Sequence, residues 1–210
     1  PTSINYTNRY NLCTPFYSFV FNEWNMDKKQ AIIATTQAHL AAHGFHATGV
    51  EQLAAAANIT KRTLYNHFGS KEALLLETMR HRDEEWMQAM QAFLQAALPE
   101  NALLAYVDYL AHWLKQDDFY GCYFINACAE YADPAHDMHK LAATHKKRIF
   151  EALHQRLPYI SVLKRPAIDS VMTMGEGLIV TQQVSGNAAA ALNATRQLAH
   201  HWTEKLLDTP

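Results

Sequence analysis

The chain has 210 residues, of which 49% are hydrophobic, and its formal net charge is −2. This length is enough for one ordinary domain or for two small domains that share a core. No apolar run approaches the roughly 20 residues that a membrane-spanning helix needs, and three cysteines are too few for a disulfide framework.

The first 25 residues differ in composition from the rest of the chain. Arg9 and Glu23 are their only charged residues, and Asn, Thr, Tyr and Phe are frequent among them. They lack the basic start, the long apolar middle and the cleavage site of a secretory signal. We therefore expect 1–25 to be an extension that is disordered or packs its aromatic residues on the rest of the protein. Met26 is an alternative start, and the cytoplasm is the expected location.

The small net charge conceals an asymmetry along the chain. Residues 26–82 contain seven Lys or Arg and four acidic residues, which gives +3, whereas 83–210 contain ten Lys or Arg and fifteen acidic residues, which gives −5. A basic part joined to an acidic part suits a polyanionic partner at one end of the molecule.

Apolar residues recur at helical spacing, and no segment shows the period-two alternation of a β-strand. Breakers separate these segments, at Pro99, Gly121, Asp133-Pro134, Pro158, Pro166 and Ser185-Gly186-Asn187. The pattern predicts an all-α protein with about nine helices, near 27–43, 50–57, 61–67, 71–97, 100–117, 122–132, 135–157, 165–184 and 188–207.

The segment 48–71, TGVEQLAAAANITKRTLYNHFGSK, has the pattern of two short helices joined by a tight turn. Thr48 and Glu51 have the spacing of a capping box at the start of the first helix. Asn58 stands in the turn, where a left-handed backbone is expected and asparagine is the most tolerant residue after glycine. Thr60 is the expected cap of the second helix. The segment is therefore a candidate helix-turn-helix.

The second of these helices has one apolar face and one face rich in hydrogen-bond donors. Leu64 and Phe68 are expected to point inward, which leaves on the outer face Lys61, Arg62, Thr63, Tyr65, Asn66 and His67. Such a helix fits the major groove of DNA. Arg62 can pair with guanine and Asn66 with adenine, and the donors that can reach phosphates are Thr60, Tyr65, His67 and Lys71. The alternative is a structural helical hairpin that never touches DNA.

The run 28–75, and above all TKRTLYNHFGSKEAL at 60–74, closely resembles the TetR/AcrR family of transcription regulators. The resemblance implies a DNA-binding domain over 26–72 and a ligand-binding and dimerisation domain over 73–210. It implies that bases are contacted by Lys61, Arg62 and Thr63, and phosphates by Thr48, Thr60, Tyr65, His67 and Lys71. It also implies a homodimeric repressor that a small molecule releases from a palindromic operator in double-stranded DNA. Asn58 departs from the glycine that is more frequent in the family.

The family's dimer is built on the last two helices, and the sequence there is consistent with such a use. Gly175 and Gly177 lie mid-helix, where glycine costs about 1 kcal/mol relative to alanine. Close approach of another helix or of a ligand would account for them. Packing within one chain is the alternative.

The segment 121–139 is the expected centre of the sensor. Cys122, Asn126 and Glu130 share one helical face, and Phe124 lies on another. Buried polar groups need partners, which a ligand or neighbouring helices can supply. Further candidate pocket walls are Trp86, Met90, Phe93, Tyr106, Trp113, Met172, Met174 and Gln183. A lining of Met and aromatic residues favours an apolar or aromatic effector, although such residues also make ordinary cores.

Other functions leave weaker signals in the sequence. His136 and His139, with His145 nearby, could hold zinc, and Cys122 or Cys128 could sense oxidants, although no neighbouring cation in the sequence lowers the pKa of either thiol. Motifs for phosphate binding, hydrolysis or zinc proteolysis are absent from the sequence. We therefore expect neither an enzyme nor a bound metal or cofactor. A regulator without a ligand, controlled by its abundance or by a protein partner, stays open.

Overall fold

A computed structural model describes residues 28–208, and within this range the chain forms helices and no strand. The expected extension at 1–25 and the alternative start at Met26 lie outside the described residues. The elements are α1 (Lys28–His43), α2 (Val50–Ala56), α3 (Lys61–Phe68), α4 (Lys71–Ala96), the 3-10 helix η1 (Pro99–Asn101), α5 (Ala102–Trp113), α6 (Tyr123–Glu130), α7 (Asp137–Arg156), α8 (Lys164–Ser185) and α9 (Ala189–Leu207). The prediction of an all-α fold is confirmed. None of the described helices is long and apolar enough to cross a membrane.

The fifth predicted helix is shorter than expected at both ends. It was expected over 100–117, but Pro99 opens a separate 3-10 turn and α5 ends at Trp113. Beyond that point the Gln116 backbone amide bonds the Trp113 carbonyl, three residues back, while the Gln116 side-chain amide donates to the His112 carbonyl at 3.0 Å. The side chain thus replaces the backbone hydrogen bond that would have continued the helix.

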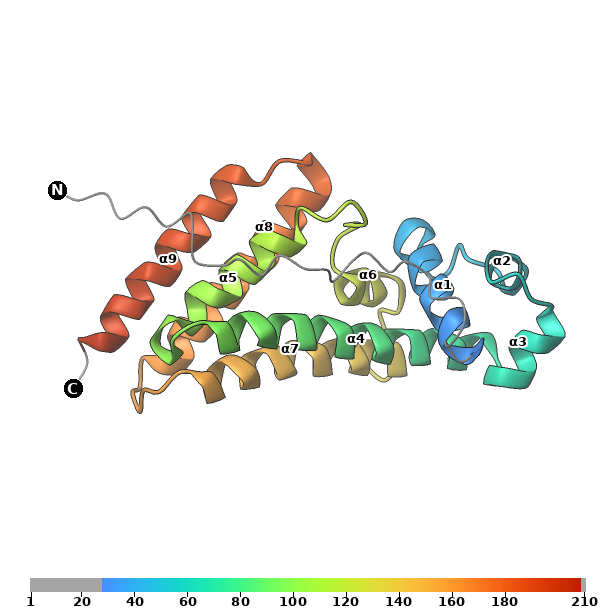
Figure 1. The fold of residues 1–210 in the computed structure, drawn as a ribbon, viewed down its shortest axis with the longest axis horizontal. Coiled ribbons are helices and arrows are strands. Elements are labelled where there is room, and N and C mark those ends of the chain that lie inside the picture. Colours follow the sequence, from blue (N-terminus) through green and yellow to red (C-terminus); the bar gives the residue numbers. More distant parts are fainter. Residues whose placement is uncertain (1–27, 209–210) are drawn as a thin grey trace.

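Helices α1 to α3 form a unit at one end of the molecule, here called the N-terminal unit, and α4 to α9 form the body (Figure 1). The long helix α4 begins beside α3 and runs on along the body, where it packs on α5 and α7. Helices α8 and α9 pack on each other and on α5. The first turns of α4 therefore belong to the core of the N-terminal unit, with Leu74 and Leu75 fully buried.

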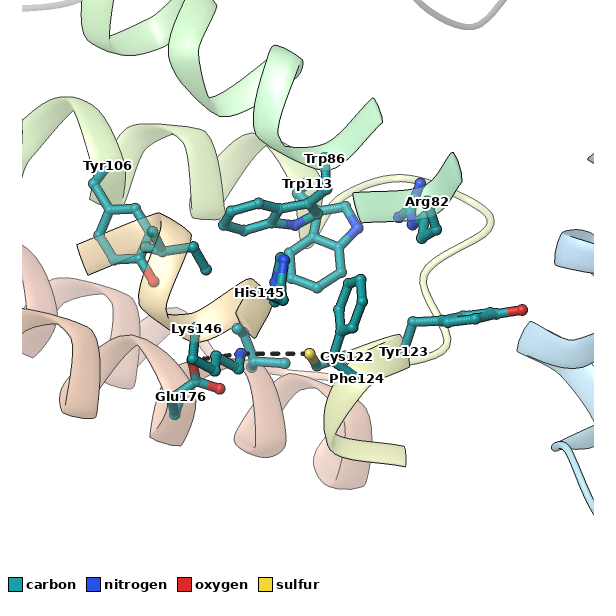
Figure 2. A pocket seen from close by; sticks show the side chains of 12 residues that line it. Arg82, Trp86, Tyr106, Trp113, Cys122, Tyr123, Phe124, His145, Lys146 and Glu176 are labelled. Atoms are coloured by element: carbon teal, nitrogen blue, oxygen red, sulfur yellow. Dashed lines mark hydrogen bonds and ion pairs between the residues drawn. The ribbon is translucent and has the colours of Figure 1, made fainter. Parts of the chain in front are cut away.

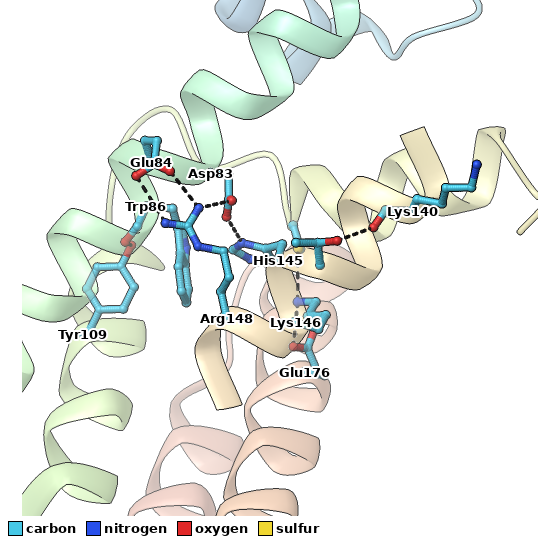
Figure 3. Close-up of polar contacts among 11 residues, drawn as sticks. Asp83, Glu84, Trp86, Tyr109, Lys140, His145, Lys146, Arg148 and Glu176 are labelled. Carbon is cyan, nitrogen blue, oxygen red and sulfur yellow. Dashed lines mark hydrogen bonds and ion pairs between the residues drawn. The ribbon is translucent and has the colours of Figure 1, made fainter. Parts of the chain in front are cut away.

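A buried ionic cluster joins α4 to α7 in the middle of the body (Figure 3). Asp83 of α4 is 3% exposed and His145 of α7 is 1% exposed, and their Oδ1 and Nδ1 atoms are 2.7 Å apart. The Arg148 guanidinium donates to Asp83 Oδ2 and also pairs with Glu84. The ring of Phe124 stacks on His145 with centroids 3.8 Å apart. Both Asp83 oxygens thus have partners, as a buried carboxylate requires.

Burial lowers the pKa of His145 to about 4, against its hydrogen bond to Asp83, with further lowering from Lys146 and Arg148. His145 is therefore neutral near pH 7, and its Nδ1–H donates to Asp83. Burial opposes the charge of Asp83, but hydrogen bonds from His145 and Arg148 hold the pKa of that carboxyl below its usual value. Arg148 supplies the charge that compensates Asp83, which is why the imidazole can stay neutral.

We expect the free energy of unfolding to fall by up to about 3 kcal/mol as the pH drops from 6.5 to 4. In this window the unfolded chain protonates His145 at its ordinary pKa, 6.5, while the folded protein does so only near pH 4. Urea unfolding at several pH values should show this loss, and His145→Asn should remove most of it. His154→Asn, on an exposed part of α7, is the control and should keep the wild-type slope. An unchanged slope in His145→Asn would contradict the assignment.

Candidate nucleic-acid interface and ligand cavity

Helices α2 and α3 are joined by the tight turn that the sequence predicts. Asn58 has a φ of 51°, in the left-handed region. The Thr60 hydroxyl caps α3 by accepting a hydrogen bond from the Thr63 amide at 3.1 Å. Gly69 ends α3 with a φ of 77°, and the Ser70 hydroxyl caps α4 by accepting from the Ala73 amide at 3.0 Å. The predicted positions of these turn and cap residues are confirmed.

The predicted capping box at the start of α2 is wrong. The cap residue is Gly49, whose amide donates to the Gln52 side chain at 2.6 Å. The Thr48 side chain instead points inward: its hydroxyl donates to the Gly44 carbonyl at 2.7 Å, and the residue is fully buried. The helix begins one residue later than the Thr48–Glu51 spacing suggested, so Glu51 stays exposed and pairs with Lys61.

The apolar side of α3 anchors it, and its polar side faces solvent. Leu64 is 0% and Phe68 8% exposed, as predicted. The exposed residues on α3 are Lys61, Arg62, Tyr65, Asn66 and His67, and Thr63 is half-buried. The ammonium of Lys61 forms an ion pair with Glu51 of α2, and that hydrogen bond raises the pKa of Lys61 and lowers that of Glu51. Lys61, one of the two cations on the exposed side of α3, thus has an ion-pair partner within the protein.

Lys71, a predicted phosphate contact, lies at the start of α4 and contacts the loop between α1 and α2. Its Nζ donates to the Phe45 carbonyl at 3.2 Å, and the residue is half-buried. On the other side of the loop, the carboxylate of Glu130 accepts from the Phe45 and His46 amides at 2.9 and 2.6 Å. Glu130 was a candidate pocket residue, and the structure places it at the N-terminal unit instead.

A small cavity lies inside the body, between α4, α5, α6, α7 and α8 (Figure 2). Of the predicted pocket residues, it is lined by Trp86, Tyr106, Trp113, Cys122 and Phe124. Its free volume is about 10 Å³, space for about one water molecule. The remaining walls are Arg82, Tyr123, His145, Lys146, Ile149, Glu176 and Ile179.

The other predicted pocket residues do not line this cavity. Met90 is fully buried in the core, and the Phe93 ring packs on Tyr109 and His112. Gln183 donates to Asn126 at 3.3 Å on the surface. Met174 is 40% exposed, and Met172 is half-buried against the core. Helical periodicity identifies buried faces, but it does not tell which buried residue borders a cavity.

Polar groups gather along one wall of the cavity (Figure 2). Lys146 Nζ donates to Glu176 Oε1 at 2.7 Å and to Cys122 Sγ at 3.6 Å. Burial opposes the charge of Lys146, but Cys122 and Glu176 beside the ammonium raise its pKa on balance. Tyr106 Oη and Glu176 Oε2 are buried and have no hydrogen-bond partner among the described residues. Burial also raises the pKa of the Tyr106 hydroxyl well above its ordinary value.

The sequence shows no cation that lowers the pKa of Cys122 or Cys128. In the folded protein, Lys146 of α7 lies beside Cys122. Burial raises the pKa of the Cys128 thiol, which disfavours its thiolate. The candidate zinc ligands do not converge, because His136 and His139 both contact Tyr131, whereas His145 faces Asp83. Within residues 28–208, no three His, Cys, Asp or Glu side chains form a group that could hold a metal ion.

Residues 32–78, which include α2, the turn and α3, match the family model described as bacterial regulatory proteins, tetR family. The segment 32–78 is thus similar to the tetR family of bacterial regulatory proteins. HTH-type transcriptional regulator YjdC of Escherichia coli K12 is 28% identical over 122 residues, 57% of this chain and 63% of YjdC. The regulator RutR of the same strain is 34% identical over 80 residues, 38% of each chain. The chain thus spans less than two thirds of the length of the curated relatives it matches.

Solved TetR-family structures share the fold over most of their length. A TetR-family transcriptional regulator from Streptomyces coelicolor has a TM-score of 0.78 at 20% identity and covers 85% of this chain and 95% of its own. The reduced form of NemR from E. coli has a TM-score of 0.73 at 21% identity and covers 88% and 99%. These family relationships agree with the expectation that the chain is no enzyme, because the relatives are transcription regulators.

Proposed function

We propose that this chain is a TetR-family, sequence-specific, DNA-binding transcription regulator. The observation that carries the proposal is the α3 surface, where exposed donors lie on a helix that Leu64 and Phe68 anchor to the core. The match of 32–78 to the family model supports the same function. Its place of action would be the cytoplasm, where bacterial DNA lies.

In the proposed complex α3 enters the major groove. Arg62 and Asn66 are exposed and suited to base edges, with Lys61 and Thr63 beside them. Phosphate contacts would come from Thr60, Tyr65 and His67 and from the amides at the start of α3. Lys61 must first leave Glu51, so Glu51 competes with DNA for this cation. Thr48 contributes no side-chain donor, because its hydroxyl is engaged inside the protein.

We propose that the protein acts as a homodimer through α8 and α9. One face of α8 is open and apolar, with Met174 40%, Val180 43% and Val184 81% exposed. Gly177 lies on this face, and a Cβ built on it would meet no atom within 4 Å. The glycine at position 175 is explained by packing within the chain, because a Cβ there would lie 2.9 Å from Leu110 Cδ1. Closing a dimer would bury the open face and place two α3 helices on a palindrome.

We propose that the cavity binds the effector whose entry releases the operator. Its walls of Trp86, Trp113 and Phe124 suit an aromatic ring, and the free Tyr106 Oη and Glu176 Oε2 suit a group that donates a hydrogen bond. An ionised carboxylate on the ligand has no proton to donate to Glu176 Oε2, whereas a neutral hydroxyl has one. Because the cavity has space for only about one water molecule, a ligand must displace wall side chains to enter.

Selection from random duplex DNA at near-physiological salt should recover a palindrome with the wild-type chain. Arg62→Ala should then relax base preference at one position of each half-site, at a cost of roughly 1–3 kcal/mol. Arg80→Ala, an exposed arginine further along α4, is the control and should keep the preference. Recovery of no preferred sequence would contradict the function, and an unchanged preference would exclude Arg62 as a base contact.

Gly177→Arg should give a folded monomer. The open space around Gly177 accommodates a side chain within one chain, and an arginine there would clash with a second α8. Analytical ultracentrifugation should show a dimer for the wild type and a monomer for the variant, with equal helicity by circular dichroism. Ala143→Arg on the exposed side of α7 is the control. A dimeric Gly177→Arg variant would place the interface elsewhere.

Calorimetric titration of the DNA-free protein should detect binding of phenol but not of benzoate. Tyr106→Phe and Glu176→Gln should each weaken phenol binding by about three- to tenfold, the effect of one hydrogen bond. Glu84→Gln, a charge change on α4 outside the cavity, should leave it unchanged. Equal binding of both probes, or no effect of the two cavity variants, would overturn the effector chemistry.

A further inference from the structure

Glu130 attaches the C-terminal end of α6 to the loop between α1 and α2. Its Oε1 accepts from the Phe45 amide at 2.9 Å and its Oε2 from the His46 amide at 2.6 Å. Each carboxylate oxygen thus holds one of two consecutive backbone amides. Hydrogen bonds to an ionised carboxylate are roughly twice as strong as neutral ones. The contact therefore fixes the loop and not merely a side chain.

The loop is shaped to receive this carboxylate. Gly44 has a φ of 80°, and a Cβ built there would lie 2.9 Å from Glu130 Oε1, so a side chain at this position would push the carboxylate away. The Phe45 ring packs edge-on against Tyr123 at 5.1 Å and Tyr131 at 6.0 Å between centroids. Lys71 holds the Phe45 carbonyl from the opposite side. Amide, carbonyl and ring of Phe45 are all engaged.

The other end of α6 lies at the cavity. Cys122 caps the helix, and with Tyr123 and Phe124 of its first turn it lines the cavity. The helix has only eight residues, so it is about 12 Å long. The Phe124 stack on His145 and the Glu130 contact therefore lie at the two ends of one short helix.

The N-terminal unit is also attached to α4, through packing of α1 and the Gln37–Glu85 hydrogen bond of 2.9 Å. Those contacts hold the unit to one helix, about which it could still pivot. The Glu130 contact, together with the Phe45 ring on Tyr123 and Tyr131, comes from a second helix and opposes that rotation. Attachment to two separate helices fixes the orientation of the N-terminal unit relative to the body, whereas attachment to α4 alone would not.

We propose that Glu130 is a positioning residue for DNA binding: it sets the orientation in which both α3 helices of a dimer meet their half-sites. This inference rests on the proposed function. In this proposal, the state in which Glu130 holds the two amides and the cavity has space for only about one water molecule is the state that binds DNA. Loss of the contact should leave each α3 surface intact but misplace the two surfaces relative to each other.

Hydrogen exchange in the DNA-free protein tests the contact itself. In Glu130→Ala the amides of Phe45 and His46 should exchange at least about tenfold faster than in the wild type, since they lose a charged acceptor. Glu130→Gln keeps one acceptor oxygen and should lie between the two. Glu151→Gln, on an exposed part of α7, is the matched control. Unchanged exchange in Glu130→Ala would overturn the proposal.

DNA binding tests the positioning role. Glu130→Ala should bind the selected palindrome about tenfold more weakly, while its affinity for a duplex with a single half-site stays at the wild-type value. Equal losses on both duplexes would mean damage to the helix-turn-helix and would overturn the proposal, as would equal affinities of variant and wild type. If the wild type selects no palindrome, the proposed function fails as well. If the wild type does select a palindrome, and Glu130→Ala has the same ratio of affinities for the palindrome and the single half-site as the wild type, only the proposed role of Glu130 fails.

Discussion

Helix α4 runs through both the N-terminal unit and the body, and the buried residues of the two parts form one core around it. Its first turns bury Leu74 and Leu75 in the N-terminal unit, and further along it carries Asp83 and Trp86 into the body. A continuous helix cannot change its position at one site without moving at the other. The Asp83–His145–Arg148 cluster then fixes α4 against α7. Since a buried carboxylate left unpaired costs several kcal/mol, this cluster holds α4 in one register on α7.

The helix-turn-helix could be predicted from the sequence because its determinants are local. Asn58 in the turn and Thr60 at the cap act on residues within a few positions, so spacing alone locates them. The error at Thr48 is of the same kind: Gly49 and Gln52 have the same spacing as Thr48 and Glu51, shifted by one residue. The Thr48 hydroxyl donates to the Gly44 carbonyl and is therefore not available as a cap, so the capping residues are Gly49 and Gln52.

The cavity and the partner of Glu130 could not be predicted in the same way. Lys146, Glu176 and Tyr106 come from three helices, and their meeting depends on how α5, α7 and α8 pack. The sequence indicated that a buried Glu130 needs a partner, and a structural partner such as an Arg or His of a neighbouring helix was favoured over a ligand. The hydrogen-bond donors are backbone amides 84 and 85 residues away, and the His46 imidazole lies beside them, with Nδ1 3.7 Å from Glu130 Oε2. Every residue has a backbone amide, so no residue type could mark those two donors.

The same geometry limits how strongly a ligand could control DNA binding. A ligand shifts an equilibrium only by the difference between its affinities for the two states. Entry into the cavity has to displace wall residues such as Phe124, which is stacked on His145. Part of the ligand's binding free energy would therefore offset the cost of opening the cavity. Only the remainder would be available to break the two hydrogen bonds of Glu130. Couplings between sites in proteins are typically about 1–3 kcal/mol, which is comparable to one or two hydrogen bonds to a charged group. Two such hydrogen bonds therefore match in size the coupling that the proposed effector would need in order to change the proposed DNA-binding orientation.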